Sequence, residues 1–157
     1  MSNKVVFRSI TEDDQPFLYT LYAGTREDEI AQTGWTDFEK ETFLRQQFIA
    51  QHQFYTEQFS RADFKIIQID DKPVGRLYID HRADEIRLID IALIPDYRNK
   101  GIGSCLLSEI IADAAKVKKP VRIHVEKYNP ALRLYERLGF LKIGDTGVYY
   151  LMEKLPD

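Results

Sequence analysis

The chain has a single cysteine and no long apolar run, and each absence excludes a class of protein. Because Cys105 stands alone, neither an intramolecular disulfide nor a cysteine-rich zinc site can form. No apolar run approaches the roughly 18 residues that a transmembrane helix requires, and residues 1–10 lack the apolar core of a secretory signal. We therefore expect a cytoplasmic protein that neither spans nor contacts a membrane.

Histidine is also scarce, and acidic residues slightly outnumber basic ones. The three histidines, His52, His81 and His124, show no HExxH or HxH spacing, so we expect no metal site. A formal net charge of -3 lacks the basic excess that binds nucleic acid, which we do not expect as a partner. With 44% hydrophobic and 30% charged residues, the 157-residue chain is expected to fold as one globular domain over residues 1–157.

Apolar periodicity in the first half predicts helices and strands in alternation. A strand is expected at residues 5–8, followed by a helix around residues 17–22. A long helix is expected over residues 36–59, where aromatic side chains recur at helical spacing. We interpret this aromatic stripe mainly as core, with a ligand-binding surface as the alternative. Three antiparallel strands are then expected at residues 64–69, 74–79 and 86–93, with turns at 70–73 and 82–85.

The second half continues in the same way. A helix is expected over residues 101–116, and an alternating strand at 121–125. Asn129 and Pro130 predict a helix N-terminus, with Asn129 as N-cap, and Gly139 predicts its end. Two final strands are expected near residues 141–143 and 148–153, separated by residues 144–147.

The most informative segment is residues 98–104, Arg-Asn-Lys-Gly-Ile-Gly-Ser, between a predicted strand and a predicted helix. Free amides and the positive dipole end at a helix N-terminus favour an anion, and glycines let a phosphate approach the backbone. Arg98 and Lys100 add positive charge, so a pyrophosphate suits this loop. The segment matches neither a Walker A motif nor the GxGxxG fingerprint. A plain turn into a helix is the alternative.

Two blocks in the right order resemble one family. Residues 91–103, Ile-Ala-Leu-Ile-Pro-Asp-Tyr-Arg-Asn-Lys-Gly-Ile-Gly, resemble the acetyl-CoA motif of the GNAT N-acetyltransferase superfamily, Arg/Gln-x-x-Gly-x-Gly/Ala after a strand. Residues 129–140, Asn-Pro-Ala-Leu-Arg-Leu-Tyr-Glu-Arg-Leu-Gly-Phe, resemble its second motif, Asn-x-Ala-x-x-Leu-Tyr-Glu-x-x-Gly-Phe. The order of elements fits from about residue 5 to residue 153, and the specific part spans residues 86–140.

The resemblance implies an α/β fold whose mixed, largely antiparallel sheet is splayed in the middle and flanked by about four helices. Acetyl-CoA is the implied cosubstrate, in the splay between the strands that hold Leu93 and Ile123, and no metal is implied. Its pantetheine arm would contact a strand backbone, and its pyrophosphate the loop amides. The implied cofactor-binding residues are Ile91, Ala92, Leu93, Arg98, Asn99, Lys100, Gly101, Ile102, Gly103, Ser104, Asn129 and Tyr135.

The resemblance also implies an acyltransferase in which an amine attacks the acetyl thioester directly in a ternary complex. Tyr135 matches the position of a general acid for the departing thiolate, with simple packing as the alternative. The backbone N–H of Leu93 is expected to stabilise the oxyanion. For the base, Asp90, Glu126, His124 and a solvent-mediated route stay open. Cys105 is expected to be a small buried helix residue and not a nucleophile.

In this family the acceptor pocket is usually built from the first two helices, their loop and the final strands. Trp35, Tyr55 and Tyr149 are the candidate substrate residues, and the acidic run at residues 27–29 would attract a cationic amine. A core role for Trp35 is the alternative. We expect a small-molecule amine as acceptor. A protein N-terminus or lysine is the first alternative and a non-catalytic acyl-CoA-binding module the second, and homodimer formation stays open.

Overall fold

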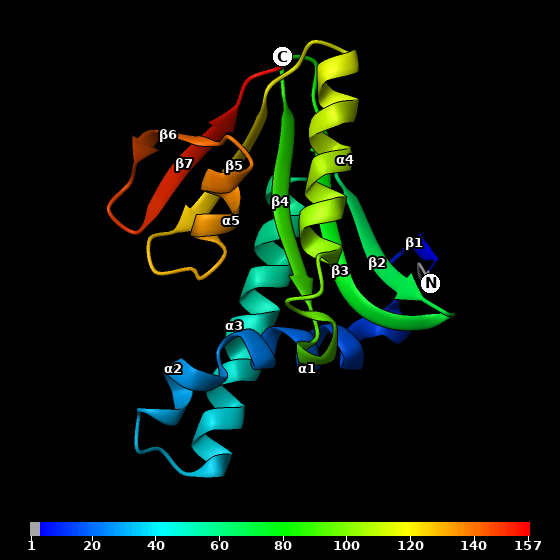
Figure 1. The fold of residues 1–157 in the computed structure, drawn as a ribbon. Helices are drawn as coiled ribbons and strands as arrows, with labels where there is room; N and C mark the ends of the chain where they lie inside the picture. The colour runs from blue at the N-terminus through cyan, green and yellow to red at the C-terminus, as the bar shows by residue number, and fades with distance from the viewer. Residues whose placement is uncertain (1–3) are drawn as a thin grey trace. The chain divides into compact units, whose positions relative to one another are not determined.

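The computed structural model describes residues 4–157, and five helices and a seven-stranded sheet lie within this range (Figure 1). The strands are hydrogen-bonded in the order β1-β2-β3-β4-β5-β7-β6, and most neighbours are antiparallel. This confirms the predicted fold class. The chain divides into two compact units, which we describe separately. The N-terminal unit runs to Leu77 and includes Ala92–Tyr97, and the C-terminal unit comprises Tyr78–Ile91 and Arg98–Asp157.

The N-terminal unit contains most of the helices. Its complete elements are β1 (Val5–Ser9), a 3-10 turn (Glu12–Asp14), α1 (Gln15–Thr25), α2 (Glu27–Ala31), α3 (Asp37–Gln58), β2 (Asp63–Ile69) and a second 3-10 turn (Pro95–Tyr97). The long strands β3 (Lys72–His81) and β4 (Ile86–Leu93) each contribute residues to both units. The C-terminal unit adds α4 (Ile102–Lys116), β5 (Val121–Glu126), α5 (Leu132–Arg137), β6 (Leu141–Asp145) and β7 (Tyr149–Lys154).

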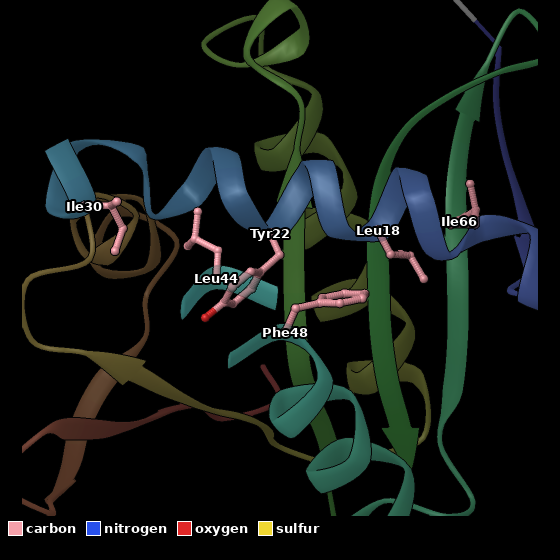
Figure 2. Packing of buried hydrophobic residues seen from close by; sticks show 6 residues of the cluster. All are labelled: Leu18, Tyr22, Ile30, Leu44, Phe48 and Ile66. Atoms are coloured by element: carbon pink, nitrogen blue, oxygen red, sulfur yellow. The ribbon is translucent and has the colours of Figure 1, made fainter. Parts of the chain in front are cut away.

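Helices α1 and α3 pack on each other through apolar side chains. Figure 2 shows the ring of Tyr22 pointing from α1 toward Leu44 and Phe48 of α3, and these residues belong to a buried cluster with Leu18 and Ile66. Thr36 begins α3, because its side chain accepts a hydrogen bond from the Glu39 amide in a capping box. The predicted long helix, and the core role of its aromatic stripe at Phe48, are confirmed.

A buried carboxylate fixes the chain between β1 and α1. Asp14 accepts two hydrogen bonds from the Arg8 guanidinium, at 2.8 and 2.7 Å, and a third from the Thr11 amide. The hydrogen bonds from Arg8 outweigh burial and lower the pKa of Asp14 to about 2. The ion pair and the capping box of Thr11 and Asp14 together fix the 3-10 turn that leads into α1.

Several predicted boundaries were wrong for local reasons. The turn between β2 and β3 uses only Asp70 and Asp71, both with positive φ as in a two-residue hairpin, so Pro73 lies inside β3. Helix α5 begins at Leu132, because Asn129 accepts a hydrogen bond from the Ala131 amide and holds a turn instead of the predicted N-cap.

Two further boundaries differ. The final strands reach Asp145 and begin again at Tyr149, with a register shift in β6 before Gly144. The fifth helix, α2, lies where a loop was expected, so the predicted count of about four helices was low.

In the C-terminal unit, β4 and β5 are paired only where they begin. Their parallel register joins Ile86 to Val121 and Arg87 to Arg122, whereas β5 continues to Glu126. The other edge of β5 pairs with β7 along its full length, and β7 pairs with β6 in the terminal hairpin (Figure 1). The backbone of β4 beyond Arg87 is therefore not hydrogen-bonded to β5, as the resemblance predicted for a splayed sheet.

An ionic cluster surrounds the paired end of these strands. Glu85, which is buried, accepts hydrogen bonds from Arg87 at 2.6 Å and from Arg122 at 3.2 Å. Arg122 in turn donates to Glu153 of β7 at 2.8 Å. Burial alone would raise the pKa of Glu85, but the two arginines lower it overall. We call these four residues the strand clamp, since they connect β4, β5 and β7.

Within residues 4–157, no helix is both long enough and apolar enough to cross a bilayer.

The packing of α1 on α3 predicts a large loss of stability on truncation. Phe48→Ala removes a buried ring and leaves a cavity, so the free energy of unfolding should fall by about 3–5 kcal/mol in urea denaturation. Phe38→Ala on the same helix is the control, because this side chain is exposed and its loss should cost less than about 0.5 kcal/mol. Equal effects of the two variants would contradict this description of the core.

The Arg8–Asp14 pair predicts a specific acid response. Because the pKa of Asp14 is lowered from 3.8 to about 2 by folding, its contribution is complete above pH 3.8 and disappears as the pH falls toward 2. The stability difference between the wild type and Asp14→Asn should therefore be constant from pH 7 to about 5 and shrink below pH 4. Urea titrations at each pH measure it, with Asp13→Asn as the exposed neighbouring control. A difference that grows on acidification would refute the assignment.

Candidate active site

The loop before α4 has the backbone of an anion-binding site. Asn99 and Gly101 have positive φ values of 59° and 82°, and Gly101 is the N-cap of the 15-residue helix α4. The first backbone bond of the helix runs from the Cys105 amide to the Gly101 carbonyl at 2.9 Å. The amides of Ile102, Gly103 and Ser104 precede this bond, so they belong to the orphan donors of the helix N-terminus. Together with the helix dipole they favour a bound anion.

The fold requires glycine at one of the two glycine positions of this loop and not at the other. Gly101 needs a left-handed backbone, which glycine adopts at little cost. Gly103 has no such need, because its φ is not positive and a Cβ there would meet nothing within 4 Å. The fold therefore tolerates a larger residue at position 103. A glycine at this position suits a ligand that approaches the backbone closely.

The flanking side chains add charge and expose a thiol. Arg98 is half-buried and Lys100 is exposed, so both place positive charge at the start of α4. Cys105 is exposed, and the prediction of a buried residue was wrong because Leu106 and Leu107 occupy the buried side of this turn. Asn129 is exposed, and its side-chain oxygen accepts a hydrogen bond from the Ala131 amide at 2.9 Å.

Two of the predicted catalytic residues, Tyr135 and Asp90, interact through charge. Tyr135 of α5 is buried, and its ring packs edge-on against Phe140 at a centroid distance of 5.6 Å. Burial raises the pKa of Tyr135 far above its usual value, and the negative charge of Asp90 on β4 raises it further. The phenol is therefore protonated at neutral pH. It can donate a hydrogen bond to a developing anion, and its ring also contributes to packing.

The end of β4 depends on a glycine that the sequence analysis did not select. A Cβ at Gly75 of β3 would lie 2.3 Å from the Ala92 carbonyl oxygen and 2.8 Å from a Leu93 side-chain carbon. Only glycine allows β3 to lie this close to β4. The Ile94 amide then donates to the Val74 carbonyl at 2.8 Å. A lone glycine within a strand-forming run was the available signal.

The candidate bases differ in their surroundings. His124 faces Arg87, with 2.9 Å between its Nδ1 and the guanidinium. Since arginine can only donate, Nδ1 must accept, and the ring proton then resides on Nε2. Burial lowers the pKa of His124, and the charge of Arg87 lowers it further. This histidine therefore has no free lone pair for a substrate proton while the contact persists. Glu126 is exposed at the end of β5. Asp90 is the candidate base whose negative charge acts on the Tyr135 phenol.

The three predicted substrate residues come from separate parts of the chain. Trp35 is exposed before α3 begins and packs edge-on against Phe43 at 5.1 Å. Tyr55 lies in the last turn of α3, which a rise of about 1.5 Å per residue places roughly 27 Å from the first turn. Tyr149 belongs to the C-terminal unit, where its ring contacts His124. Trp35 and Tyr55 therefore cannot both line a small acceptor site.

Metal ligands do not gather in the described chain. Among residues 4–157, no three His, Cys, Asp or Glu side chains come close enough to hold an ion.

The mixed α/β sheet, with two parallel strands that pair only where they begin, matches one family of enzymes. A family model described as "Acetyltransferase (GNAT) family" matches residues 21–140. Acetyltransferase Atu2258 of Agrobacterium fabrum is 30% identical over 114 residues, which cover 71% of this chain and 82% of that protein. The chain therefore belongs to the GNAT acetyltransferase family.

Solved structures share the fold at low sequence identity. The PaiA N-acetyltransferase of Thermoplasma acidophilum, determined in complex with coenzyme A, has a TM-score of 0.70 and 20% identity, with 97% of this chain and 99% of that chain covered. The ribosomal-protein-S18-alanine N-acetyltransferase of Escherichia coli has a TM-score of 0.63 and 21% identity, with 98% and 95% covered. At these identities the likeness concerns the fold.

The open space at Gly103 predicts that binding and stability separate. Gly103→Val should leave the free energy of unfolding unchanged or raise it by up to about 1 kcal/mol, because valine has a higher helix propensity than glycine. The same change should weaken coenzyme A binding at least tenfold in calorimetric titration, since the side chain occupies the space beside the amides. Ser108→Val, at an exposed position later in α4, is the control. Undiminished coenzyme A binding by Gly103→Val would exclude this loop as the site.

Proposed function

We propose that this protein is a cytoplasmic N-acetyltransferase that transfers the acetyl group of acetyl-CoA to the amine of a small molecule. Family membership supports acetyl transfer. The observation that carries the choice of donor is the α4 N-terminus, where orphan amides, flanking cations and an unobstructed glycine suit a pyrophosphate. The proposed loop residues are Arg98, Asn99, Lys100, Gly101, Ile102, Gly103 and Ser104.

The remaining contacts are proposed for the part of β4 that lies beyond its short ladder to β5. Beyond Arg87, the edge of β4 toward β5 makes no ladder bonds, so backbone groups of Ile91, Ala92 and Leu93 are proposed to bond the pantetheine amides. Asn129 is proposed to contact the same arm. When bound, acetyl-CoA supplies an activated thioester, and the chain's own residues orient it and move protons around it.

The proposed reaction takes two protons from the substrate ammonium and gives one to the thiolate. The ammonium would lose its first proton to Asp90, directly or through water, and its nitrogen would then form a bond to the thioester carbon. The backbone N–H of Leu93 would donate to the negative charge that develops on the carbonyl oxygen. As the C–S bond breaks, the Tyr135 hydroxyl would donate its proton to the departing thiolate, and the second proton lost by the nitrogen would restore the phenol. The raised pKa of Tyr135 makes loss of its proton unfavourable in the free protein. The proton would therefore leave only when a negatively charged thiolate is there to accept it.

Tyr135→Phe tests the proposed acid. This variant retains the ring that packs on Phe140, so the protein should remain folded and its affinity for acetyl-CoA should change less than about threefold. Without the phenol proton, kcat should fall by about 100-fold. Thiol release with an amine panel measures kcat, and calorimetric titration measures affinity, with ATP as the negative ligand. Tyr128→Phe is the control, because that side chain is 96% exposed. Full activity of Tyr135→Phe would leave Tyr135 a packing residue only.

The same assays decide between the proposed function and its alternatives. Failure of the well-folded wild type to bind acetyl-CoA would refute the donor. Binding without turnover on any small amine, but with turnover on peptide N-termini or lysine side chains, would move the acceptor to proteins.

A further inference from the structure

One side-chain contact joins β4 to β5 beyond their backbone ladder. The ladder ends at the pair of Arg87 and Arg122, and His124 lies two residues further along β5. Alternate residues of a strand point to the same face, so Arg122 and His124 share one face of β5. The Arg87 guanidinium lies 2.9 Å from Nδ1 of His124. We call this pair, Arg87 and His124, the side-chain bridge. Both residues belong to the C-terminal unit.

Both ends of the side-chain bridge are oriented by other contacts. Arg87 donates from Nε to Glu85 at 2.6 Å, which holds the guanidinium on the β4 side. The ring of Tyr149 from β7 lies edge-on to the imidazole of His124, at a centroid distance of 6.4 Å. The two side chains are therefore held in place by neighbours on their own side, so little freedom remains to be lost when they meet.

The side-chain bridge exists in only one protonation state of His124. Arginine can only donate, so Nδ1 must accept and the imidazole must be neutral. A protonated imidazole carries N–H groups on both nitrogens, which would turn a donor and a positive charge toward the guanidinium. Burial lowers the pKa of His124 from its ordinary 6.5, and Arg87 lowers it further against the opposing effect of Glu85. The bridge is therefore present above pH 6.5 and is lost as the pH falls through the lowered pKa.

The charges around His124 leave Arg87 as the group that its protonation acts on first. The titratable and charged side chains that face His124 come from three strands: Glu85 and Arg87 of β4, Arg122 and Glu126 of β5, and Tyr149 of β7. Arg122 is neutralised by ion pairs with Glu85 and Glu153. Glu126 is exposed, so solvent and salt screen its charge.

The side-chain bridge connects the two strands that lead to the proposed base and acid. Asp90 lies on β4, three residues after Arg87, and β5 is followed by α5, which carries Tyr135. The charge of Asp90 raises the pKa of Tyr135, so the two groups are close enough to interact. Reaction rates depend steeply on the placement of the reacting groups. A contact that fixes β5 relative to β4 therefore bears on the rate.

We propose that neutral His124 is a positioning residue for acetyl transfer, since its bridge to Arg87 holds β4 and β5 at the separation that the reaction needs. This separation sets the distance between Asp90 and Tyr135. Protonation of His124 releases the bridge, so its contribution to the rate is lost in weak acid. The inference rests on the proposed function.

The first test compares kcat at two pH values, with thiol release as the measurement. His124→Asn keeps an acceptor oxygen near the position of Nδ1 but cannot be protonated. Its kcat should stay within about twofold of the wild type at about pH 7.5. The ratio of the wild-type kcat to that of His124→Asn should then fall by about threefold or more at about pH 5. Both proteins share the titrations of the amine and of the donor's phosphate, so these cancel in the ratio.

His124→Phe removes the acceptor and keeps a ring against Tyr149. Its kcat should be about threefold or more below the wild type at about pH 7.5 and approach the wild type at about pH 5. A kcat equal to the wild type at both pH values would overturn the inference.

His52→Asn provides a matched control. His52 of α3 is also half-buried, and burial and an arginine also lower its pKa, but it belongs to the N-terminal unit. This variant should keep the wild-type pH profile of kcat. A ratio that does not change with pH for His124→Asn, or that changes equally for His52→Asn, would overturn the role of the side-chain bridge.

A second test needs no turnover. Proton NMR titration follows the imidazole of His124 in the free protein, and His124→Asn identifies its signal. Arg87→Gln removes the positive charge, so the pKa of His124 should rise by about half a pH unit. Glu85 keeps Arg122 as a partner in this variant, and circular dichroism checks the fold. An unchanged pKa in folded Arg87→Gln would overturn the bridge. If the variant does not fold, the kcat ratios of the two His124 variants decide.

Failure of the inference differs from failure of the proposed function. If acetyl-CoA fails to bind but the pKa of His124 depends on Arg87, the side-chain bridge stands as a protonation-sensitive contact and the donor is wrong. If acetyl transfer is measured and the kcat ratio does not change with pH, the proposed function stands and the positioning role of His124 is wrong.

Discussion

The interaction on which the rest of the structure depends is the short parallel ladder between β4 and β5. It joins only two residue pairs, at Ile86 and Arg87, and then the strands are no longer hydrogen-bonded to each other. A strand with unbonded backbone groups is costly unless those groups find other partners. The opposite edge of β5 pairs with β7 along its full length, and β4 beyond Arg87 has no ladder to β5. The proposed function assigns the amides of the donor to this stretch of β4.

Three residues near the ends of strands and helices differ in what the fold itself requires of them. Tyr135 fills space against Phe140 and remains a protonated phenol for the same reason, its burial. Gly75 allows two strands to approach and thereby sets the position of the Ala92 carbonyl. Gly103 differs from both, since the fold makes no demand there. The packing of β3 against β4 explains Gly75. The proposed ligand, which needs close approach to the backbone, would explain Gly103.

Local signals in the sequence predicted most elements, including α4 and the glycine loop before it. Thr36 marked the start of α3 correctly because capping depends on residues within one turn. The same locality explains the misses. Three of the five residues of α2 are acidic, so the segment has no apolar periodicity and a loop was expected there. The hydrogen bond from Arg76 to Gln51 joins β3 to α3, and no spacing rule connects these two positions. Trp35 and Tyr55 were both chosen as substrate residues because they are aromatic. Trp35 precedes the 22-residue helix α3, whereas Tyr55 lies in its last turn.

The strand clamp has a thermodynamic consequence for ligand entry. Glu85, Arg87, Arg122 and Glu153 link β4, β5 and β7 at the closed end of the gap, through bonds of 2.6 to 3.2 Å. The separation of the two strands is then set by covalent chain and ionic contacts before any ligand arrives. Strand ends that the fold already holds apart need not be ordered by a ligand. If the donor binds there as proposed, little of its binding free energy is spent on reorganising the protein.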